Sequence, residues 1–191
     1  MKKTLTVILA LVLVVVMSVA GTVAYLTSTK TVTNTFTVGK VEITLDETDV
    51  DVYGVKDGNT RVMTNTYRLI PGHTYIKDPV VHVDADSENC WLFVKVENGI
   101  SDLEATGTTT IAAQLAANGW TPISEGSNIY AYSRIATKTD TDVPVFRSFT
   151  IADKATLPAN GTGLDVVVTA YAIQADSFST AAEAWTAAGL S

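Results

Sequence analysis

Few side chains in this sequence suit catalysis, and their spacing matches no common catalytic motif. The 191-residue chain has two histidines, His73 and His82, and one cysteine, Cys90. A cysteine and a histidine can act as nucleophile and base only where the fold brings them into hydrogen-bond reach. The chain has no H-E-x-x-H zinc motif, no G-x-S-x-G elbow and no glycine-rich phosphate loop. We therefore predict no catalytic residue, no metal ligand set and no cofactor.

Acidic side chains gather in two places, and calcium prefers carboxylate oxygens as ligands. The first group contains Asp46, Glu47, Asp49 and Asp51, and the second contains Asp84 and Asp86. Neither group has the glycine and the terminal glutamate of an EF-hand loop. Charged, solvated loops are the simpler interpretation, and calcium binding stays an open alternative.

His82 and the single cysteine, Cys90, have structural interpretations. His82 alternates with Val81 and Val83, so a strand there would turn it toward solvent or a sheet edge. A single cysteine excludes an internal disulfide, so stability must come from the core. We interpret Cys90, beside Trp91, as a small buried hydrophobe. A free reactive thiol and an intermolecular bridge are the alternatives.

The first 24 residues have the layout of an export signal. Lys2 and Lys3 precede an unbroken apolar run over residues 7–17, and small residues stand near Ala24. That order is typical of a secretory signal peptide, here residues 1–24, with cleavage between Ala24 and Tyr25. An uncleaved anchor is the rival interpretation, because the 20 residues from Leu5 to Ala24 are just long enough to span a bilayer.

Removal of residues 1–24 leaves an acidic chain of one-domain size. Without Lys2 and Lys3, 11 Lys+Arg face 20 Asp+Glu over 167 residues, a formal charge of −9. That length can bury about 70% of its unfolded surface, so residues 25–191 are predicted to form one domain. The negative charge argues against nucleic acid as a partner. It also argues against anionic lipid, leaving the uncleaved signal as the only membrane attachment.

An alternating strand follows the predicted cleavage site. The stretch "TVTNTFTV" places Val32, Phe36 and Val38 on one face, with Asn34 as the polar exception on that face. Gly39 separates it from "VEITLDE", whose apolar residues have the opposite parity, and this predicts a bulge or kink within one long strand. The acidic, glycine-rich residues 46–60 then indicate a solvated loop, with at most a short strand over 50–53.

Further short strands and two helices complete the pattern. "CWLFVKV" is apolar on both parities and predicts a central strand covered on both faces. "LDVVVTAYAIQA" is β-branched and aromatic, which also predicts the interior of a sheet. "TTIAAQLAANGW", with Gly119 after its end, and "STAAEAWTAAG", with a capping-box spacing, predict short helices. The fold class is all-β: a jelly-roll-like β-sandwich with two short helices, after an N-terminal signal helix.

The stretch "GTVAYLTSTKTVTNTFTVGKVEITL" resembles the start of the TasA/camelysin (CalY) family of exported bacterial proteins. Weaker likenesses to the same group are "IPGHTYIKDPVVHV", "VPVFRSFTI" and "AYAIQADSFSTAAEAW". The resemblance implies cleavage by a SipW-type signal peptidase and a jelly roll that is secreted to the extracellular matrix or the cell surface. It also implies biofilm matrix fibres in which the N-terminal strand of one subunit completes a sheet of the next.

Carried onto this chain, the donor strand is roughly residues 25–39, with Val32, Phe36 and Val38 as the inserted assembly side chains. The alternative for the isolated monomer is that residues 32–38 pack in their own sheet, which is compatible with exchange on assembly. A free alternating strand can add to an exposed sheet edge, so the chain itself would be the principal partner. A monomeric surface or fibre-accessory protein with the same fold is the first alternative. Camelysin-like members are associated with metallopeptidase activity, but this chain shows no zinc-ligand set, so we predict that it is not an enzyme.

Overall fold

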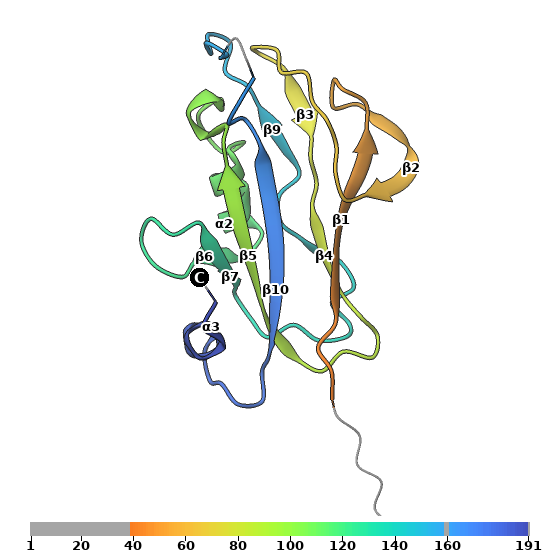
Figure 1. Ribbon diagram of the computed structural model, residues 1–191, viewed down its shortest axis with the longest axis vertical. Coiled ribbons are helices and arrows are strands. Elements are labelled where there is room, and N and C mark those ends of the chain that lie inside the picture. Colours follow the sequence, from red (N-terminus) through yellow and green to blue (C-terminus); the bar gives the residue numbers. More distant parts are fainter. Residues whose placement is uncertain (1–38, 159–160, 191) are drawn as a thin grey trace, which may run out of the picture. The chain divides into compact units, whose positions relative to one another are not determined.

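The structure is a computed structural model that describes residues 39–158 and 161–190 of the chain (Figure 1). Its strands form three antiparallel sheets, with the neighbour orders β2-β1-β4-β8, β10-β5-β7-β6 and β3-β9. The strands are Ile43–Val50 (β1), Lys56–Val62 (β2), Thr74–Ile76 (β3), Val80–Val83 (β4), Cys90–Asn98 (β5), Trp120–Pro122 (β6), Ile129–Tyr132 (β7), Val143–Pro144 (β8), Ser148–Thr150 (β9) and Val166–Gln174 (β10). This architecture confirms the predicted all-β sandwich.

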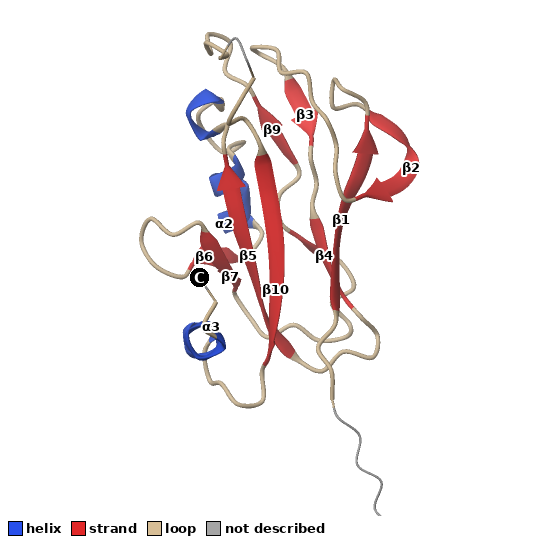
Figure 2. Cartoon of the chain, in the orientation of Figure 1, coloured by secondary structure: helices blue, strands red, loops and turns tan. Residues whose placement is uncertain are grey.

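Two short helical segments lie between β5 and β6, and a third follows β10 (Figure 2). They are the 3-10 turn η1 (Ser101–Leu103), α2 (Ile111–Ala117) and α3 (Ala181–Ala188). The helix α3 begins with the predicted capping box, since Glu183 N donates to Thr180 Oγ1 and the Glu183 carboxylate accepts from Thr180 N. Gly119 takes a φ of +85° after α2, a left-handed conformation that glycine adopts without strain. The predicted signal helix lies outside the described residues.

Side chains from both large sheets meet in one apolar core. Val81 of β4 and Leu92 and Val94 of β5 are fully buried in this core. Tyr75 of β3 stacks on Phe149 of β9 with ring centroids 4.9 Å apart, and both rings belong to the same cluster. The small sheet therefore contributes to the same core as the two large sheets.

The strand β5 is covered on both faces, as its two-parity apolar pattern predicts. Its second face carries Phe93, which is fully buried beneath α3. The Phe93 ring lies 4.9 Å from the Trp185 ring, and the Tyr171 ring of β10 meets Trp185 edge-on at 5.4 Å. Helix α3 thus closes the outer face of this sheet.

The strand β10 lies at a sheet edge, which differs from the interior position that its composition predicts. It pairs with β5 over all nine residues, from Val166 opposite Asn98 to Gln174 opposite Cys90. On its other side, no strand of residues 39–158 or 161–190 pairs with it. The expectation was wrong for these residues because composition reports the apolar surroundings of a strand but not how many neighbours it has.

The predicted loop over residues 46–60 is instead a hairpin. β1 continues to Val50, and β2 pairs with it through Glu47 opposite Val62 and Thr48 opposite Arg61. The Asp51 carboxylate accepts hydrogen bonds from the backbone N–H groups of Tyr53 and Val55, which closes the turn. Polar residues obscure this strand in the sequence, because all of β2 except Val62 is exposed.

The other sheet edges are short or polar. β6 has three residues and contains Pro122, and β8 has two residues and contains Pro144. Proline has no backbone N–H to offer to another strand, so these edges are poor templates for pairing. The edge of β2 is polar and contains Gly58. Among the described strands, β10 is therefore the long, apolar edge.

Candidate functional site

A groove of about 750 Å³ lies between β1 and the first residues of β10. Its two sides come from strands that lie next to each other without hydrogen bonding, one from each large sheet (Figure 1). The lining residues that matter below are Leu45, Glu47, Lys77, Phe149, Val166 and Val168. We call this the β1–β10 groove.

The base of the groove is part of the apolar core. Ile100 and Phe149 line it and are buried, with 1% and 2% of their surface exposed. Leu45, Val166 and Val168 belong to the same core cluster but are only partly buried. The core is therefore less completely covered along this groove than it is beneath β5, and apolar side chains there face open space.

The lining also contains polar residues, and among them is one buried ion pair. Lys77 Nζ donates to Glu47 Oε2 at 2.7 Å, and both residues are at least nine-tenths buried. Asn65 Nδ2 donates to Glu47 Oε1 at 3.0 Å and to Thr48 O at 2.9 Å. Burial of an ion pair carries a large desolvation cost, which only good geometry and further hydrogen bonds offset.

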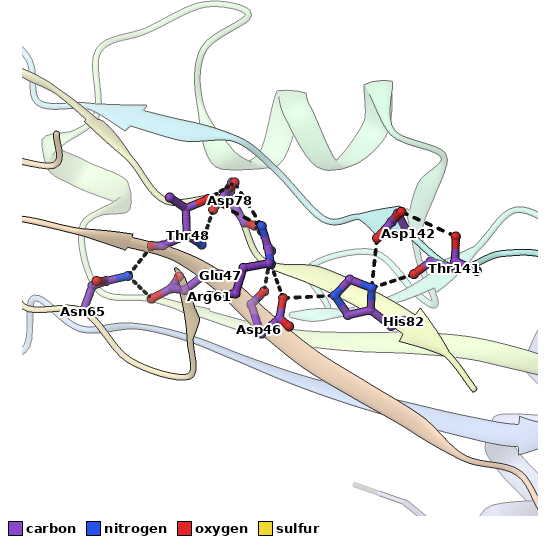
Figure 3. A network of polar contacts seen from close by, with 9 residues as sticks. All are labelled: Asp46, Glu47, Thr48, Arg61, Asn65, Asp78, His82, Thr141 and Asp142. Carbon is purple, nitrogen blue, oxygen red and sulfur yellow. Dashed lines mark hydrogen bonds and ion pairs between the residues drawn. The ribbon is translucent and has the colours of Figure 1, made fainter. Parts of the chain in front are cut away.

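The opposite face of β1 holds a second polar network, shown in Figure 3. The Asp46 carboxylate accepts from His82 Nε2 at 3.0 Å and also from the Arg61 guanidinium. Arg61 Nη2 donates to the backbone oxygens of Asp46 and Asp78, at 3.1 and 3.2 Å. The Asp78 carboxylate accepts from Thr48 N at 2.7 Å and Thr48 Oγ1 at 2.8 Å. These contacts tie β1, β2 and the start of β4 together.

Both ring nitrogens of His82 face acceptors. Nδ1 lies 2.5 Å from Thr141 O and 3.0 Å from Asp142 Oδ1, while Nε2 faces Asp46. Only the doubly protonated ring can donate from both nitrogens. Partial burial opposes the charge, but the hydrogen bonds to Asp46 and Thr141 outweigh it and raise the pKa of His82. Burial likewise opposes the charge of Asp46, but the bonds from His82 and Arg61 lower the pKa of its carboxyl.

Members of the two acidic groups of the sequence have partners within the protein. Asp46 and Glu47 point to opposite faces of β1 and pair with different cations, which differs from the predicted solvated loop. In the second group, the Asp84 carboxylate accepts from Asp86 N at 2.9 Å and closes a turn. Across residues 39–158 and 161–190, no three His, Cys, Asp or Glu side chains gather in a way that could hold a metal ion.

The surroundings of Cys90 and His73 indicate structural roles for both side chains. Cys90 is fully buried, and burial together with the nearby Asp140 raises the pKa of its thiol to about 11. A thiol with that pKa is not a nucleophile at neutral pH. His73 Nε2 donates to Tyr53 O at 2.9 Å, and its ring meets the Tyr75 ring edge-on. The sequence predicted that the His82 side chain faces solvent or a sheet edge. In the structure it is partly buried and hydrogen-bonded within the network described above.

The structure leaves the predicted processing and assembly residues untested. Ala24, Tyr25, Val32, Phe36 and Val38 all lie outside the described residues. No helix within residues 39–190, where described, is long and apolar enough to cross a membrane, and the N-terminal apolar run lies outside that part.

Sequence reasoning missed the β1–β10 groove. One signal was present: Glu47 has the same parity as the apolar residues Ile43 and Leu45, which places a carboxylate on the inward face of β1. Its partner Lys77 is 30 residues away and has no local pattern that marks it. The pair could be found only once β1 and the approach to β4 were placed together.

Comparison with known proteins adds one match. The family described as camelysin metallo-endopeptidase matches residues 1–81, which end within β4 and include β1, β2 and β3. This match confirms the resemblance to the TasA/camelysin family that the N-terminal residues predict, over less than half of the chain. No curated protein and no solved structure matches the chain.

Proposed function

We propose that this protein is a secreted structural subunit of extracellular matrix fibres, and that it polymerises by strand donation. In this proposal, residues 25–39 of one copy lie in the β1–β10 groove of the next copy. Val32, Phe36 and Val38 of the donor fill the apolar base of the groove. The observation that carries the proposal is β10, a nine-residue strand of interior composition with an unpaired edge among the described residues.

The physical basis is the unmet bonding capacity of that edge. An unpaired strand presents a row of backbone N–H and C=O groups, which an added strand can satisfy. The inner side chains Val166 and Val168 are partly exposed in the groove, so an apolar donor would also remove their surface from water. An alternating donor supplies both contributions at once, backbone pairing along its length and apolar side chains on one face.

The same contact explains why filaments would form. A donor segment and a groove on different parts of the chain make a head-to-tail contact, which does not close on itself unless the rotation happens to form a ring. Export is supported by Lys2, Lys3, the apolar run and the Ala24–Tyr25 boundary, with a SipW-type signal peptidase as the processing partner. The camelysin match begins in this same region.

A metallopeptidase is the second candidate, because the matched family carries that description. His82 does not support it, since both of its ring nitrogens are held by protein acceptors. Incubation of the purified protein with casein, with and without a chelator, separates the two candidates. Chelator-sensitive cleavage that tracks with metal content would favour the enzyme.

Electron microscopy tests the structural proposal directly. The exported form of the full chain is purified, concentrated and examined in negative stain, and we expect filaments of one width. Persistent monomers at high concentration would contradict the proposal. They would favour the alternative of a surface or fibre-accessory protein, and co-purification with matrix fibres of the producing cell would then be the next measurement.

A further inference from the structure

The donor segment carries one polar residue on its apolar face. Val32, Phe36 and Val38 share that face with Asn34 because side chains repeat every two residues along a strand. An asparagine pressed against an apolar surface without hydrogen bonds is costly. Strand donation as proposed above therefore leaves a question, namely which group of the groove receives the Asn34 amide.

Among the polar residues that line the groove, Glu47 and Lys77 are buried and paired. The inward row of β1 reads Ile43, Leu45 and Glu47, and Glu47 pairs with Lys77 at the groove surface. The rest of the base near this pair is apolar, including Phe149 and Val168. The apolar face of the donor and the inward row of β1 thus each contain one polar residue, Asn34 and Glu47.

The Lys77 ammonium has unused bonding capacity. An ammonium has three N–H donors, and within the described part of the chain Lys77 Nζ donates one hydrogen bond, to Glu47. Lys77 is only 9% exposed, so water does not easily supply the missing acceptors. The Glu47 carboxylate accepts from Lys77 and Asn65, and a carboxylate can accept about four hydrogen bonds. Both members of the pair can therefore bind a further polar group.

We propose that Asn34 of the donor binds the Glu47–Lys77 pair of the acceptor copy, and that this contact fixes the register of strand donation. The inference rests on the proposed strand donation. An amide fits the pair because its oxygen accepts from the Lys77 ammonium while its NH₂ group donates to the Glu47 carboxylate. Neither a hydrocarbon nor a second cation would satisfy both partners.

The contact would exclude other registers as well as favour one. A slip of two residues keeps the apolar face inward but replaces Asn34 with Val32 or Phe36 beside the ion pair. The pair would then lose its added hydrogen bonds, and Asn34 would lie on apolar surface. A single buried asparagine sets register in coiled coils by the same physics.

A compensating set of variants tests the inference, with the critical concentration for assembly of the exported full-length chain measured by sedimentation of filaments. We expect Asn34→Leu to raise the critical concentration about tenfold, the effect of losing one hydrogen bond to a charged group. The double variant Glu47→Leu/Lys77→Met should raise it by a similar factor. The combination of all three changes should restore it to within about threefold of the unmodified protein, because Asn34 and the ion pair are then both removed.

Thr35→Val is the matched control, since Thr35 lies on the opposite face of the donor, and it should change the critical concentration less than about twofold. Circular dichroism establishes that each variant folds. If the groove variants do not fold, disulfide capture gives the register instead. A chain with Asn34→Cys is mixed with one carrying Asn65→Cys, and a chain with Phe36→Cys serves as the comparison. The capture at position 34 should exceed that at position 36 several-fold.

The outcomes separate the two proposals. Failure of the unmodified protein to form filaments overturns strand donation, and the register contact falls with it. Filaments from Asn34→Leu at an unchanged critical concentration overturn the register contact alone. The same holds if the combined variant is as impaired as the two parents together, or if disulfide capture is equal at positions 34 and 36.

Discussion

The strands β5 and β10 are neighbours of equal length but differ in how they are covered. Each has nine residues and is rich in apolar side chains, and they pair along their whole length. β5 lies between β10 and β7, and Leu92, Phe93 and Val94 in its middle are fully buried. No residue of β10 reaches that degree of burial, and Val167 is 46% exposed.

The difference shows that a strand with the apolar composition of an interior strand can lie at the edge of a sheet. Natural proteins usually protect edges with short strands, charges or prolines. The edges at β6 and β8 follow that rule through Pro122 and Pro144, whereas β10 does not. A long, apolar, unpaired edge is a predicted site of aggregation, and in our proposal the donor segment of another copy covers it.

The largest expected effect comes from a charge on the donor. Phe36→Asp places a carboxylate on the apolar face that would enter the β1–β10 groove, at a position that the proposed register sets against apolar side chains. We expect the critical concentration for assembly to rise more than about 100-fold. The free energy of unfolding of the monomer should change by less than about 0.5 kcal/mol. Sedimentation and denaturant titration measure the two quantities, and an equal loss of both would contradict donation.

The second prediction compares two valines that lie directly opposite each other. Val96 of β5 is buried and Val168 of β10 is only partly buried. We expect Val96→Ala to lower the free energy of unfolding of the monomer by about 2 kcal/mol, since it removes buried methyl groups. Val168→Ala should lower it by less than about 1 kcal/mol in the monomer, because part of that side chain already contacts water.

Assembly should remove the difference between the two valines. In filaments, the donor would cover Val168, so Val168→Ala should raise the critical concentration several-fold, beyond its small effect on the monomer. Denaturation of monomers and sedimentation of filaments are measured on the same preparations. If Val168→Ala destabilises the monomer as much as Val96→Ala does, then β10 is already covered in the free protein.

The smallest effect concerns the polar network on the other face of β1, where His82 of β4 binds Asp46 of β1. Its folded pKa is raised above the ordinary value of 6.5, so its contribution to stability is fully present below pH 6.5. That contribution is lost as the pH rises through the folded pKa. Asp46, with a lowered pKa, contributes above its ordinary value of 3.8 and is lost as the pH falls through its folded pKa.

The network should therefore be strongest between about pH 4 and 6.5. We expect His82→Gln to remove about 1 kcal/mol of stability at pH 6 and less at pH 8. Denaturant titrations at the two pH values measure this loss, and Lys138→Gln is a control for the change in net charge. A loss that is the same at both pH values would show that the imidazolium does not supply the stabilisation.

Local patterns predicted most of the fold. The two-parity apolar run at Cys90–Asn98 identified the central strand, and the Thr180–Glu183 spacing identified the start of α3. Each of these two patterns lies within a few consecutive residues, so it can be recognised from the sequence alone. The strand β2 was missed because its stability comes from pairing with β1 and from the ion pair between Arg61 and Asp46, not from apolar side chains.

The groove was beyond sequence reasoning for a different reason. Glu47 reaches Lys77 across 30 residues, and Val168 and Leu45 line the same groove although they are far apart in the sequence. Such contacts depend on how the two sheets pack, which no short window of sequence reports. The proposed donor segment could be predicted from "TVTNTFTV", because alternation is a local pattern. The proposed acceptor groove could be found only in the structure, because it depends on how the sheets pack.

The blunted edges at β2, β6 and β8 limit how many neighbours one molecule can have. Under the proposed strand donation, with one donor segment and one receptive edge among the described strands, each subunit would have a valence of two. Material built from such units grows as unbranched chains, and a network of them would need a separate crosslinking component. Growth would also proceed only at the two ends, so a chain with its donor segment removed would act as a terminator, and small amounts of it would shorten fibres.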